Sequence, residues 1–388
     1  MKILVNGTPL LAPLTGIGQY IRHLFTAMEK MPGADIQMYY GLRCEKGMRL
    51  PSVGTTRAVQ RTYGLLQRFL PWPRSIKKLG EKAMFAYHTR TGLDGVVYHE
   101  PNHVPLPYNG PLVLTVCDLS CFDLPQTHPK ERVRLMQRDM PAAIERADHI
   151  IVISEATGDT LRRWFKVDPA RISTTYLAAD PRFHPRTRET LTPALADLGL
   201  TPGSYVLSVG TLEPRKNLGT LFAAYAGLPT ALRQSYPLVV AGMSGWNTKG
   251  LMKSAEELIR RGELRLLGYV ADELIAPLYA GAAAFCYPSR YEGFGLPVLE
   301  AMASGVPVIT SNTTSLPEVV GDAGVMLDPD DVESLTNRLR QLLEDRVFAG
   351  TLAALGLTRS RQFSWDICAA ETLAVYERAL TNRGIRLG

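Results

Sequence analysis

The sequence predicts an α/β protein made of two doubly wound domains that face each other across a cleft. Apolar, strand-like runs alternate with segments of helical periodicity, a pattern typical of parallel sheets covered by helices on both faces. The alternation is interrupted after Tyr176 by a stretch rich in proline, threonine and charge, as expected of a linker. At 388 residues the chain is long enough for two hydrophobic cores.

The first domain is predicted over residues 1–182. Its first strand, ILVNG, leads through a glycine-containing turn into a helix whose apolar residues from Ile17 to Met28 share one face. Ligands bind beyond the carboxyl ends of parallel strands, so the turns that follow these strands are the expected place of a site. The other strands predicted here are VVYHE (96–100), PLVLTVCD (111–118) and HIIVIS (149–154).

The second domain is predicted over residues 190–365, after the linker. We expect the final helical segment, 366–388, to cross back and brace the first domain; the alternative is that it caps its own domain. The strands predicted for the second domain are SYVLSVG (204–210), PLVVAG (237–242), LRLLG (264–268), AAAFCYPS (282–289) and VPVITS (306–311).

Composition indicates a folded, soluble protein, because hydrophobic residues make up 46% of the chain and charged residues 21%. No run approaches the roughly 18 consecutive apolar residues that span a bilayer. No apolar signal core precedes the first strand, so we expect a cytoplasmic location. The five cysteines are odd in number and scattered, which argues against a disulfide framework, and Cys117 and Cys121 lack nearby ligand pairs for a metal.

The segment 61–90 carries seven basic residues and one acidic residue, interleaved with apolar and aromatic side chains. This mixture suits a face that lies on anionic lipid, and it favours peripheral attachment to the inner face of the cytoplasmic membrane. The alternative is an ordinary amphipathic helix pair packed on its own domain. A net charge of +6 is weak evidence for an anionic partner, and no nucleic-acid-binding module is recognisable, so nucleic acid is not expected as a partner.

Two turns at the carboxyl edge of the predicted sheets are suited to anions. In LTGIGQY, Gly16 and Gly18 open the first helix, where backbone amides can approach an anion, although tight turns that bind nothing are the alternative. In GTLEPRKN, Arg215 and Lys216 precede a helix, where each cation is unfavourable by about 0.3 to 1 kcal/mol unless an anion accompanies it. We therefore predict a bound phosphate or diphosphate there; a solvated pair on a loop is the alternative.

The stretch EGFGLPVLE combines two carboxylates with a helix start. Glu292 lies in the loop after a strand, and Glu300 lies about one turn inside the helix that follows. The free amides of Phe294, Gly295 and Leu296 form another positive helix end for phosphate. Because carboxylates accept hydrogen bonds from hydroxyl pairs, the stretch predicts a ligand with phosphates flanked by hydroxylated rings, such as a nucleoside diphosphate sugar.

The run from GYVADEL to VVGDAG, residues 268–324, resembles the donor-binding half of retaining glycosyltransferases of family 4, which have the GT-B fold of two Rossmann-like domains. The order TGIG, HEPN, TVCDLS, ISEAT, GTLEPRKN and EGFGLPVLE extends the likeness over nearly the whole chain. The resemblance implies a role for each site residue: Glu300 holds the ribose, Glu292 the transferred sugar, Arg215 and Lys216 the diphosphate, Tyr269 and Val270 the base, and Gly16 and Gly18 allow closure over the phosphates.

Two positions depart from the family pattern. Thr211 stands where members often carry an arginine, and Cys117 stands beside Asp118 where many members carry a histidine that contacts the sugar. A thiol cannot replace an imidazole as a donor. Three explanations stay open: the contact is lost, it is replaced by His99 or His103, or the donor sugar lacks a 6-hydroxyl.

Two further motifs are interpreted as structural. Ser315 and Glu318 in SLPE predict a capping box, in which each side chain satisfies a backbone amide of the helix start. The string DPD at 328–330 resembles a metal-binding DxD but is interpreted as a loop and helix cap. No metal or other cofactor is expected.

These observations and the resemblance together predict a retaining, metal-independent hexosyltransferase. Its expected partners are a nucleotide-diphosphate sugar, favoured as GDP-linked mannose or rhamnose, and a lipid-linked saccharide of bacterial O-antigen or exopolysaccharide synthesis. The resemblance further implies front-face attack, with the leaving phosphate assisting deprotonation of the acceptor. The alternatives are a nucleotide-sugar epimerase of the same fold and a non-catalytic subunit that binds nucleotide sugar.

Overall fold

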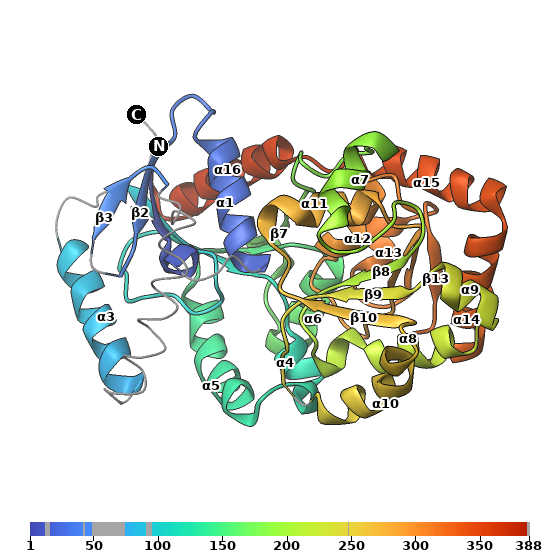
Figure 1. Ribbon diagram of the computed structural model, residues 1–388. Helices are drawn as coiled ribbons and strands as arrows, with labels where there is room; N and C mark the ends of the chain where they lie inside the picture. Colours follow the sequence, from blue (N-terminus) through green and yellow to red (C-terminus); the bar gives the residue numbers. More distant parts are fainter. Residues whose placement is uncertain (12–15, 42, 49–73, 91–94, 247, 386–388) are drawn as a thin grey trace.

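The computed structural model describes residues 1–11, 16–41, 43–48, 74–90, 95–246 and 248–385. The first part of the predicted membrane-facing segment 61–90, residues 61–73, therefore falls outside the described residues, and the part from 74 onward, which contains helix α3, is included. Figure 1 shows two α/β units side by side, with the N-terminal one in blue and green and the C-terminal one in yellow and orange.

The N-terminal sheet has the strand order β3-β2-β1-β4-β5-β6-β7. Its strands are parallel except for β3, which pairs antiparallel with β2 at the edge. The strands are β1 (Lys2–Asn6), β2 (Asp35–Tyr39), β3 (Cys44–Lys46), β4 (Val96–Glu100), β5 (Leu112–Val116), β6 (His149–Val152) and β7 (Ile172–Thr174).

Helices α5 and α6 of this domain pack against the sheet, and α1 packs on α16. In α1, the apolar face predicted from the sequence is buried from Tyr20 to Met28. The helices are α1 (Gly16–Met28), α3 (Arg74–His88), α4 (Ser120–Asp123), α5 (Lys130–Arg146) and α6 (Glu155–Phe165), with short 3-10 turns η1 (Thr8–Leu11), η2 (Pro125–Thr127) and η3 (Pro169–Arg171).

The C-terminal sheet is parallel throughout and has the order β10-β9-β8-β11-β12-β13. The order reverses between β8 and β11, and ligands bind at such a switch point in doubly wound sheets. The predicted doubly wound architecture is confirmed for both sheets. The strands are β8 (Val206–Val209), β9 (Leu238–Ala241), β10 (Leu264–Gly268), β11 (Ala284–Tyr287), β12 (Val308–Ser311) and β13 (Val325–Leu327).

Helices cover both faces of the C-terminal sheet, as Figure 1 shows. Turn η4 (Pro214–Lys216) lies between β8 and the first of them. The helices are α7 (Arg188–Ala196), α8 (Leu218–Ala226), α9 (Thr230–Ser235), α10 (Lys249–Arg260), α11 (Asp272–Ala280), α12 (Leu296–Ala303), α13 (Leu316–Val320), α14 (Val332–Glu344) and α15 (Arg346–Ser360).

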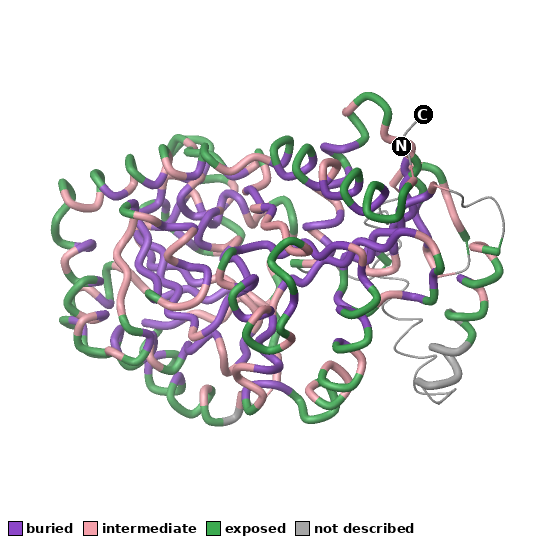
Figure 2. Tube along the Cα trace, turned by 180° about the vertical axis from the view of Figure 1, so that it is seen from behind, coloured by how far each residue is buried: buried purple, intermediate pink, exposed green. Residues whose placement is uncertain are grey.

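Helix α16 (Trp365–Asn382) returns from the C-terminal unit and packs on α1 and on the N-terminal sheet, as Figure 1 shows in red. Buried residues run through both units in Figure 2. One apolar cluster contains Ile3 and Val97 of the first sheet as well as Leu207 and Phe285 of the second, so the core is continuous across the junction. Within the described residues, no helix is both long and apolar enough to cross a bilayer.

Tyr376 of α16 fixes a buried histidine in the N-terminal core. Its hydroxyl lies 2.6 Å from Nδ1 of His99, whose Nε2 lies 2.7 Å from the hydroxyl of Thr115. Burial lowers the pKa of His99 to about 3, so the ring is neutral. Because both ring nitrogens are engaged in the core, this arrangement does not support the sugar contact predicted for His99.

We expect Tyr376→Phe to lower the free energy of unfolding by about 1 to 3 kcal/mol, because it leaves a buried imidazole nitrogen without a partner. The transfer activity predicted from the sequence should stay within about twofold of wild type, because both ring nitrogens of His99 are engaged with Tyr376 and Thr115. Chemical denaturation and an activity assay measure the two effects. A large loss of turnover at unchanged stability would show instead that His99 serves a ligand.

Candidate active site

The loops that follow β5, β8 and β11 meet where the carboxyl ends of the two sheets face each other. Gly293 of the β11 loop lies so close to the β5 loop that a Cβ built on it would be 1.9 Å from the carbonyl oxygen of Cys117 and 3.0 Å from Cβ of Asp118. Only a glycine permits this approach. The two domains are therefore in direct contact at this edge.

The centre of this site is a buried group of charges. Glu292 accepts hydrogen bonds from Lys216 Nζ at 2.7 Å and Arg215 Nη1 at 3.1 Å. Ser289 Oγ donates to the same carboxylate at 2.6 Å. Arg215 also pairs through Nε with Glu213 at 2.6 Å. Arg215 and Lys216 thus converge with Glu292, as one site rather than as solvated loop residues.

Within the described structure, the anion beside the two cations is Glu292 itself. Glu292 and Lys216 are only 7% and 8% exposed, and buried cations need a carboxylate partner. Burial alone would raise the pKa of Glu292, but Lys216 and Arg215 lower it to about 2. Burial and Arg215 lower the pKa of Lys216. The sugar-hydroxyl contact predicted for Glu292 stays a prediction.

Three residues of this group were missed in the sequence because each looks structural there. Glu213 lies within GTLEPRKN, two positions before Arg215, Ser289 ends the predicted strand AAAFCYPS, and Tyr287 is a buried strand residue. In the structure, Tyr287 accepts a hydrogen bond from Lys216, and the ammonium also lies 5.0 Å from the centre of that ring. Their polar atoms become relevant only where the strands bring them to Lys216 and Glu292.

The start of α12 has the predicted anion-binding geometry. Gly295 precedes the helix with a φ of 116°, a left-handed conformation that favours glycine. Within the described part of the chain, no hydrogen bond involves the backbone amides of Phe294, Gly295 and Leu296. Unpaired amides at a helix N-terminus are ready donors to a phosphate.

Glu300 lies on α12, half-buried, beside Tyr279 and the interdomain linker. Burial raises the pKa of Glu300 to about 7, while Arg182 opposes that rise. Arg182 pairs with Asp272 at 2.7 Å and with Asp180 at 3.3 Å. Glu300 therefore has a pKa close to neutral pH. No salt bridge joins it to a basic side chain among the described residues.

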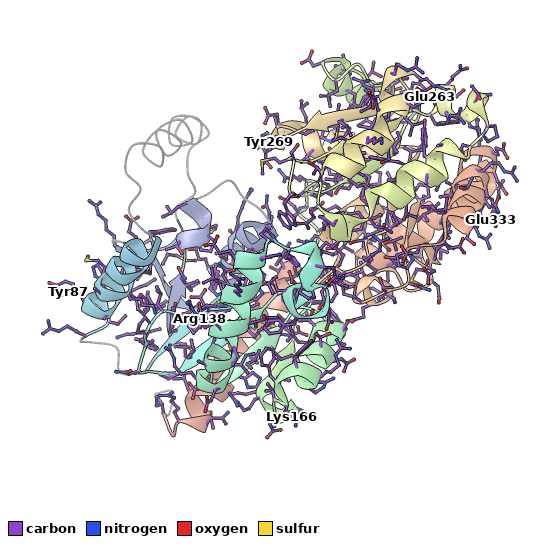
Figure 3. All side chains as sticks on the ribbon, turned by 90° about the horizontal axis from the view of Figure 1, so that it is seen from below. Tyr87, Arg138, Lys166, Glu263, Tyr269 and Glu333 are labelled. Carbon is purple, nitrogen blue, oxygen red and sulfur yellow. The ribbon has the colours of Figure 1, made fainter. Side chains whose placement is uncertain are left out.

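Tyr269 and Val270, predicted to meet the base, directly follow β10. Gly16 and Gly18, predicted to allow domain closure, lie at the start of α1. Tyr269 is 70% exposed directly after β10, and Figure 3 shows it at the edge of the C-terminal domain. Val270 is half-buried beside it. Gly16 opens α1, where a Cβ would meet nothing within 4 Å, and Gly18 is buried in the first turn. Packing therefore does not account for the glycine at position 16.

On the N-terminal side, Asp118 and His103 lie together. Asp118 accepts hydrogen bonds from the backbone and hydroxyl of Ser120, at 3.0 and 2.6 Å. Burial opposes the charge of Asp118, but Arg215 and His103 hold its pKa below the ordinary range. His103 Nε2 lies 3.2 Å from the carbonyl oxygen of Asp118. Burial keeps Cys117 a neutral thiol by raising its pKa.

A cavity of about 890 Å³ opens beside these two residues in the N-terminal domain. The sequence did not indicate its walls, because they come from the ends of β1 and β4 and from one face of α5, far apart in the chain. Its polar lining includes Asn6, Lys82, Asn102, Arg132, Arg138 and Arg146. Figure 3 labels Arg138 on α5.

The predicted capping box of Ser315 and Glu318 is wrong. Ser315 precedes α13 without a side-chain cap, and its hydroxyl lies 2.9 Å from the carbonyl oxygen of Glu292 and 2.7 Å from that of Phe294. The Glu318 carboxylate instead accepts hydrogen bonds from the other domain, because α6 presents unpaired amides there.

The string DPD forms a turn and does not gather metal ligands. Asp328 accepts a hydrogen bond from the backbone of Asp330 at 2.8 Å, and Asp331 caps α14 through Ser334. Across the described residues, no group of three or more histidine, cysteine, aspartate or glutamate side chains is placed to hold a metal ion.

Comparison with known proteins identifies the family. Residues 198–355 match the family model described as glycosyl transferases group 1. The whole chain is similar to O-antigen chain mannosyltransferase B of Escherichia coli, with 38% identity over 386 residues that cover 97% of this chain and 100% of that protein. The chain belongs to the group 1 glycosyltransferases. A group 1 glycosyltransferase takes its sugar from a nucleotide-sugar donor, and the predicted resemblance to family 4 is confirmed.

Other relatives of this glycosyltransferase share parts of it. The serotype-specific mannosyltransferase WbdA of E. coli is 33% identical over 276 residues, which cover 69% of this chain and 34% of that protein. Among solved structures, sucrose-phosphate synthase of Thermosynechococcus elongatus aligns with a TM-score of 0.74 at 22% identity, covering 98% of this chain and 100% of that one.

A second structural neighbour is WaaG, a glycosyltransferase involved in lipopolysaccharide biosynthesis. It aligns with a TM-score of 0.68 at 17% identity, covering 97% of this chain and 99% of that one. At such identities the alignments show the fold alone, and they confirm the predicted GT-B architecture.

Proposed function

We propose that the protein is a retaining mannosyltransferase that transfers mannose from GDP-mannose to a lipid-linked O-antigen saccharide. The similarity to an E. coli O-antigen chain mannosyltransferase over both full lengths carries this proposal. It favours mannose over rhamnose, and transfer over epimerisation or a non-catalytic role. The intact charge cluster at Glu292 supports catalysis as well.

The donor diphosphate lies between Arg215, Lys216 and the amides that open α12. Breaking a glycosyl phosphate bond leaves negative charge on the diphosphate, and preorganised donors stabilise that charge. These cations supply the charge that a metal supplies in other transferases. Glu292 holds both cations in place and prevents them from repelling each other. The acceptor then attacks from the leaving-group face, with the diphosphate taking its proton.

The nucleoside extends from the diphosphate toward Glu300 and the rim at Tyr269 and Val270. The ribose hydroxyls donate to the carboxylate of Glu300. Backbone groups after β10 meet the base. Gly16 and Gly18 leave space for the N-terminal domain above the phosphates.

Glu300 gives this donor site a pH dependence. Its pKa is about 7 in the folded protein, so the group is mostly protonated at pH 6 and mostly ionised at pH 8. An ionised carboxylate accepts hydrogen bonds from hydroxyls more strongly than a neutral acid does. We expect GDP affinity to rise several-fold between pH 6 and pH 8, measured by calorimetry. Glu300→Gln should remove this rise; a rise that persists in the variant would assign it to another group.

The acceptor saccharide occupies the cavity beside Asp118 and His103. Its polar amides and cations suit hydroxyl-rich sugars. We assign to His103 the sugar contact that family members make at the position of Cys117, because His103 lies against Asp118 there. If His103 makes this contact, the cysteine at position 117 does not require a donor sugar that lacks a 6-hydroxyl.

A lipid-linked acceptor places the enzyme at the inner face of the cytoplasmic membrane. Tyr87, on α3 and 65% exposed, and the basic residues of 61–90 form the proposed contact with anionic lipid. Figure 3 shows Tyr87 on the outer side of the N-terminal domain.

A transfer assay with labelled GDP-mannose and membranes that contain the lipid-linked saccharide tests the proposed function. We expect label to enter the lipid-linked fraction as an α-mannoside, whereas UDP-glucose should give no product. Conversion of the donor without any acceptor would identify an epimerase instead. Nucleotide binding without turnover would identify a non-catalytic subunit. A thermal-shift panel of nucleotides detects such binding, because a nucleotide at 100 times its dissociation constant stabilises the folded protein by about 2.7 kcal/mol.

A further inference from the structure

The N-terminal end of α6 lies against the donor loop that contains Glu292. Ser154 caps this helix by accepting from the amide of Thr157 at 3.1 Å. The same hydroxyl donates to the carbonyl oxygen of Gly293 at 2.7 Å, and the Thr157 hydroxyl lies 3.2 Å from that oxygen. Both residues are at most 1% exposed, so water does not replace these contacts.

The backbone amides of the first two residues of α6 donate to a side chain of the other domain. Glu318 of α13 accepts from the amides of Glu155 at 2.8 Å and Ala156 at 2.7 Å. The hydroxyl of Tyr176 donates to the same carboxylate at 3.2 Å. A carboxylate at a helix N-terminus is stabilised by the helix dipole as well as by these hydrogen bonds.

Apart from the cap that Ser154 makes to Thr157 within α6, these contacts cross between the domains. Ser154 and Thr157 follow β6 of the first sheet, whereas Gly293 and Glu318 follow β11 and β12 of the second. Moving the domains apart would break every one of them together. They therefore stabilise the closed arrangement and have no counterpart in an open one.

Gly293 stands between the two functional parts of the donor loop. The preceding residue is Glu292, which holds the cations, and the next three residues supply the helix-start amides. A hydrogen bond to the Gly293 carbonyl therefore fixes the peptide that connects them. A displacement of about 1 Å at a reacting group can cost about 100-fold in rate, so this position is sensitive.

We propose that Ser154 and Thr157 are positioning residues for the donor loop, and that Glu318 is the latch that holds the domains in the closed, transfer-competent arrangement. The proposal rests on the proposed function of Glu292 and the α12 amides, and it adds that the acceptor domain completes the donor site. The enzyme thereby couples turnover to domain closure, since the loop is aligned only when α6 is in place.

Variants at Ser154 separate loop positioning from helix capping. Ser154→Asp keeps an acceptor for the Thr157 amide but has no proton to donate to Gly293, whereas Ser154→Thr keeps both functions. We expect Ser154→Asp and Ser154→Ala to lower kcat at least about tenfold, as loss of one well-placed hydrogen bond allows. Ser154→Thr should restore kcat. Full activity in Ser154→Asp would show that the hydroxyl only caps the helix, and would overturn the positioning role.

The latch is tested by comparing Glu318→Ala with a control variant, Glu333→Gln. The control removes an exposed carboxylate from the first turn of α14, away from the junction. Small-angle scattering of the full, unliganded chain should show a larger radius of gyration for Glu318→Ala only. With GDP as the probe, Kd should stay within about twofold while kcat for mannosyl transfer falls at least about tenfold.

Two results would overturn the proposed latch role of Glu318. The first is an unchanged radius of gyration in Glu318→Ala. The second is a loss of GDP affinity and melting temperature as large as the loss of kcat, which marks a purely structural role. Scattering needs no substrate. If the wild-type protein transferred no mannose, the proposed function would fail while the scattering comparison would still decide on the latch.

Discussion

Replacing Glu292 with alanine should lower turnover by about 100- to 1,000-fold, the cost of losing one preorganised electrostatic group of a transition state. The variant leaves Arg215 and Lys216 adjacent and without their shared carboxylate. Breaking a buried ion pair on one side costs about 3 to 5 kcal/mol of stability. We therefore expect both a slower enzyme and an earlier unfolding transition of the C-terminal domain, measured by steady-state kinetics and chemical denaturation.

The control for this prediction restores charge balance. Combining Glu292→Gln with Lys216→Met removes one charge of each sign and should recover much of the stability while leaving turnover low. Turnover that survives Glu292→Ala at near wild-type levels would contradict the assignment of the charge cluster as the diphosphate site.

Gly293→Ala should lower turnover by about 100-fold or more without unfolding the protein. The added Cβ would lie 1.9 Å from the carbonyl oxygen of Cys117, so the two domains could not reach their observed separation. Reacting groups displaced by about 1 Å lose about this much rate. GDP affinity should change little, because the phosphate-binding groups all belong to the C-terminal domain.

Gly350→Ala is the matched control for Gly293→Ala. Gly350 is exposed on α15, where a Cβ would meet nothing within 4 Å, so the substitution should leave turnover unchanged and add slight helix stability. If Gly293→Ala kept full turnover, transfer would not require the close approach of the β5 and β11 loops.

Much of the fold was predictable because its signals are local. The predicted strands, which correspond to β1, β4, β5, β6 and β8 to β12, are short apolar runs, and α1 has its apolar residues on one face. The strands β2, β3, β7 and β13 were not predicted; β3, for example, consists of Cys44, Glu45 and Lys46 and has no apolar run to indicate it. The break after Tyr176 falls between β7, the last strand of the first sheet, and β8, the first strand of the second along the chain. The predicted return of the last helix agrees with α16 packing on α1, but sequence periodicity could not choose between that and capping its own domain.

The candidate site was predictable in part. EGFGLPVLE and GTLEPRKN indicate their residues because turn, charge and helix start stand together in the sequence. The roles of individual side chains were less predictable. His99, the first residue of HEPN, looks like a ligand group, yet Tyr376, 277 residues later, holds it in the core. Glu318 looks like the partner of Ser315, yet it binds an amide 163 residues earlier.

By itself, the sequence determined the two doubly wound domains and the motif-bearing turns at their carboxyl edges, because hydrophobic period and turn chemistry are properties of neighbouring residues. The tertiary structure alone decided which charges meet. Glu292 faces Lys216, 76 residues away, and Ser154 faces Gly293, 139 residues away, because two separate sheets bring their loops to one junction. Pairing over such separations depends on the packing of whole domains, and no local pattern encodes it.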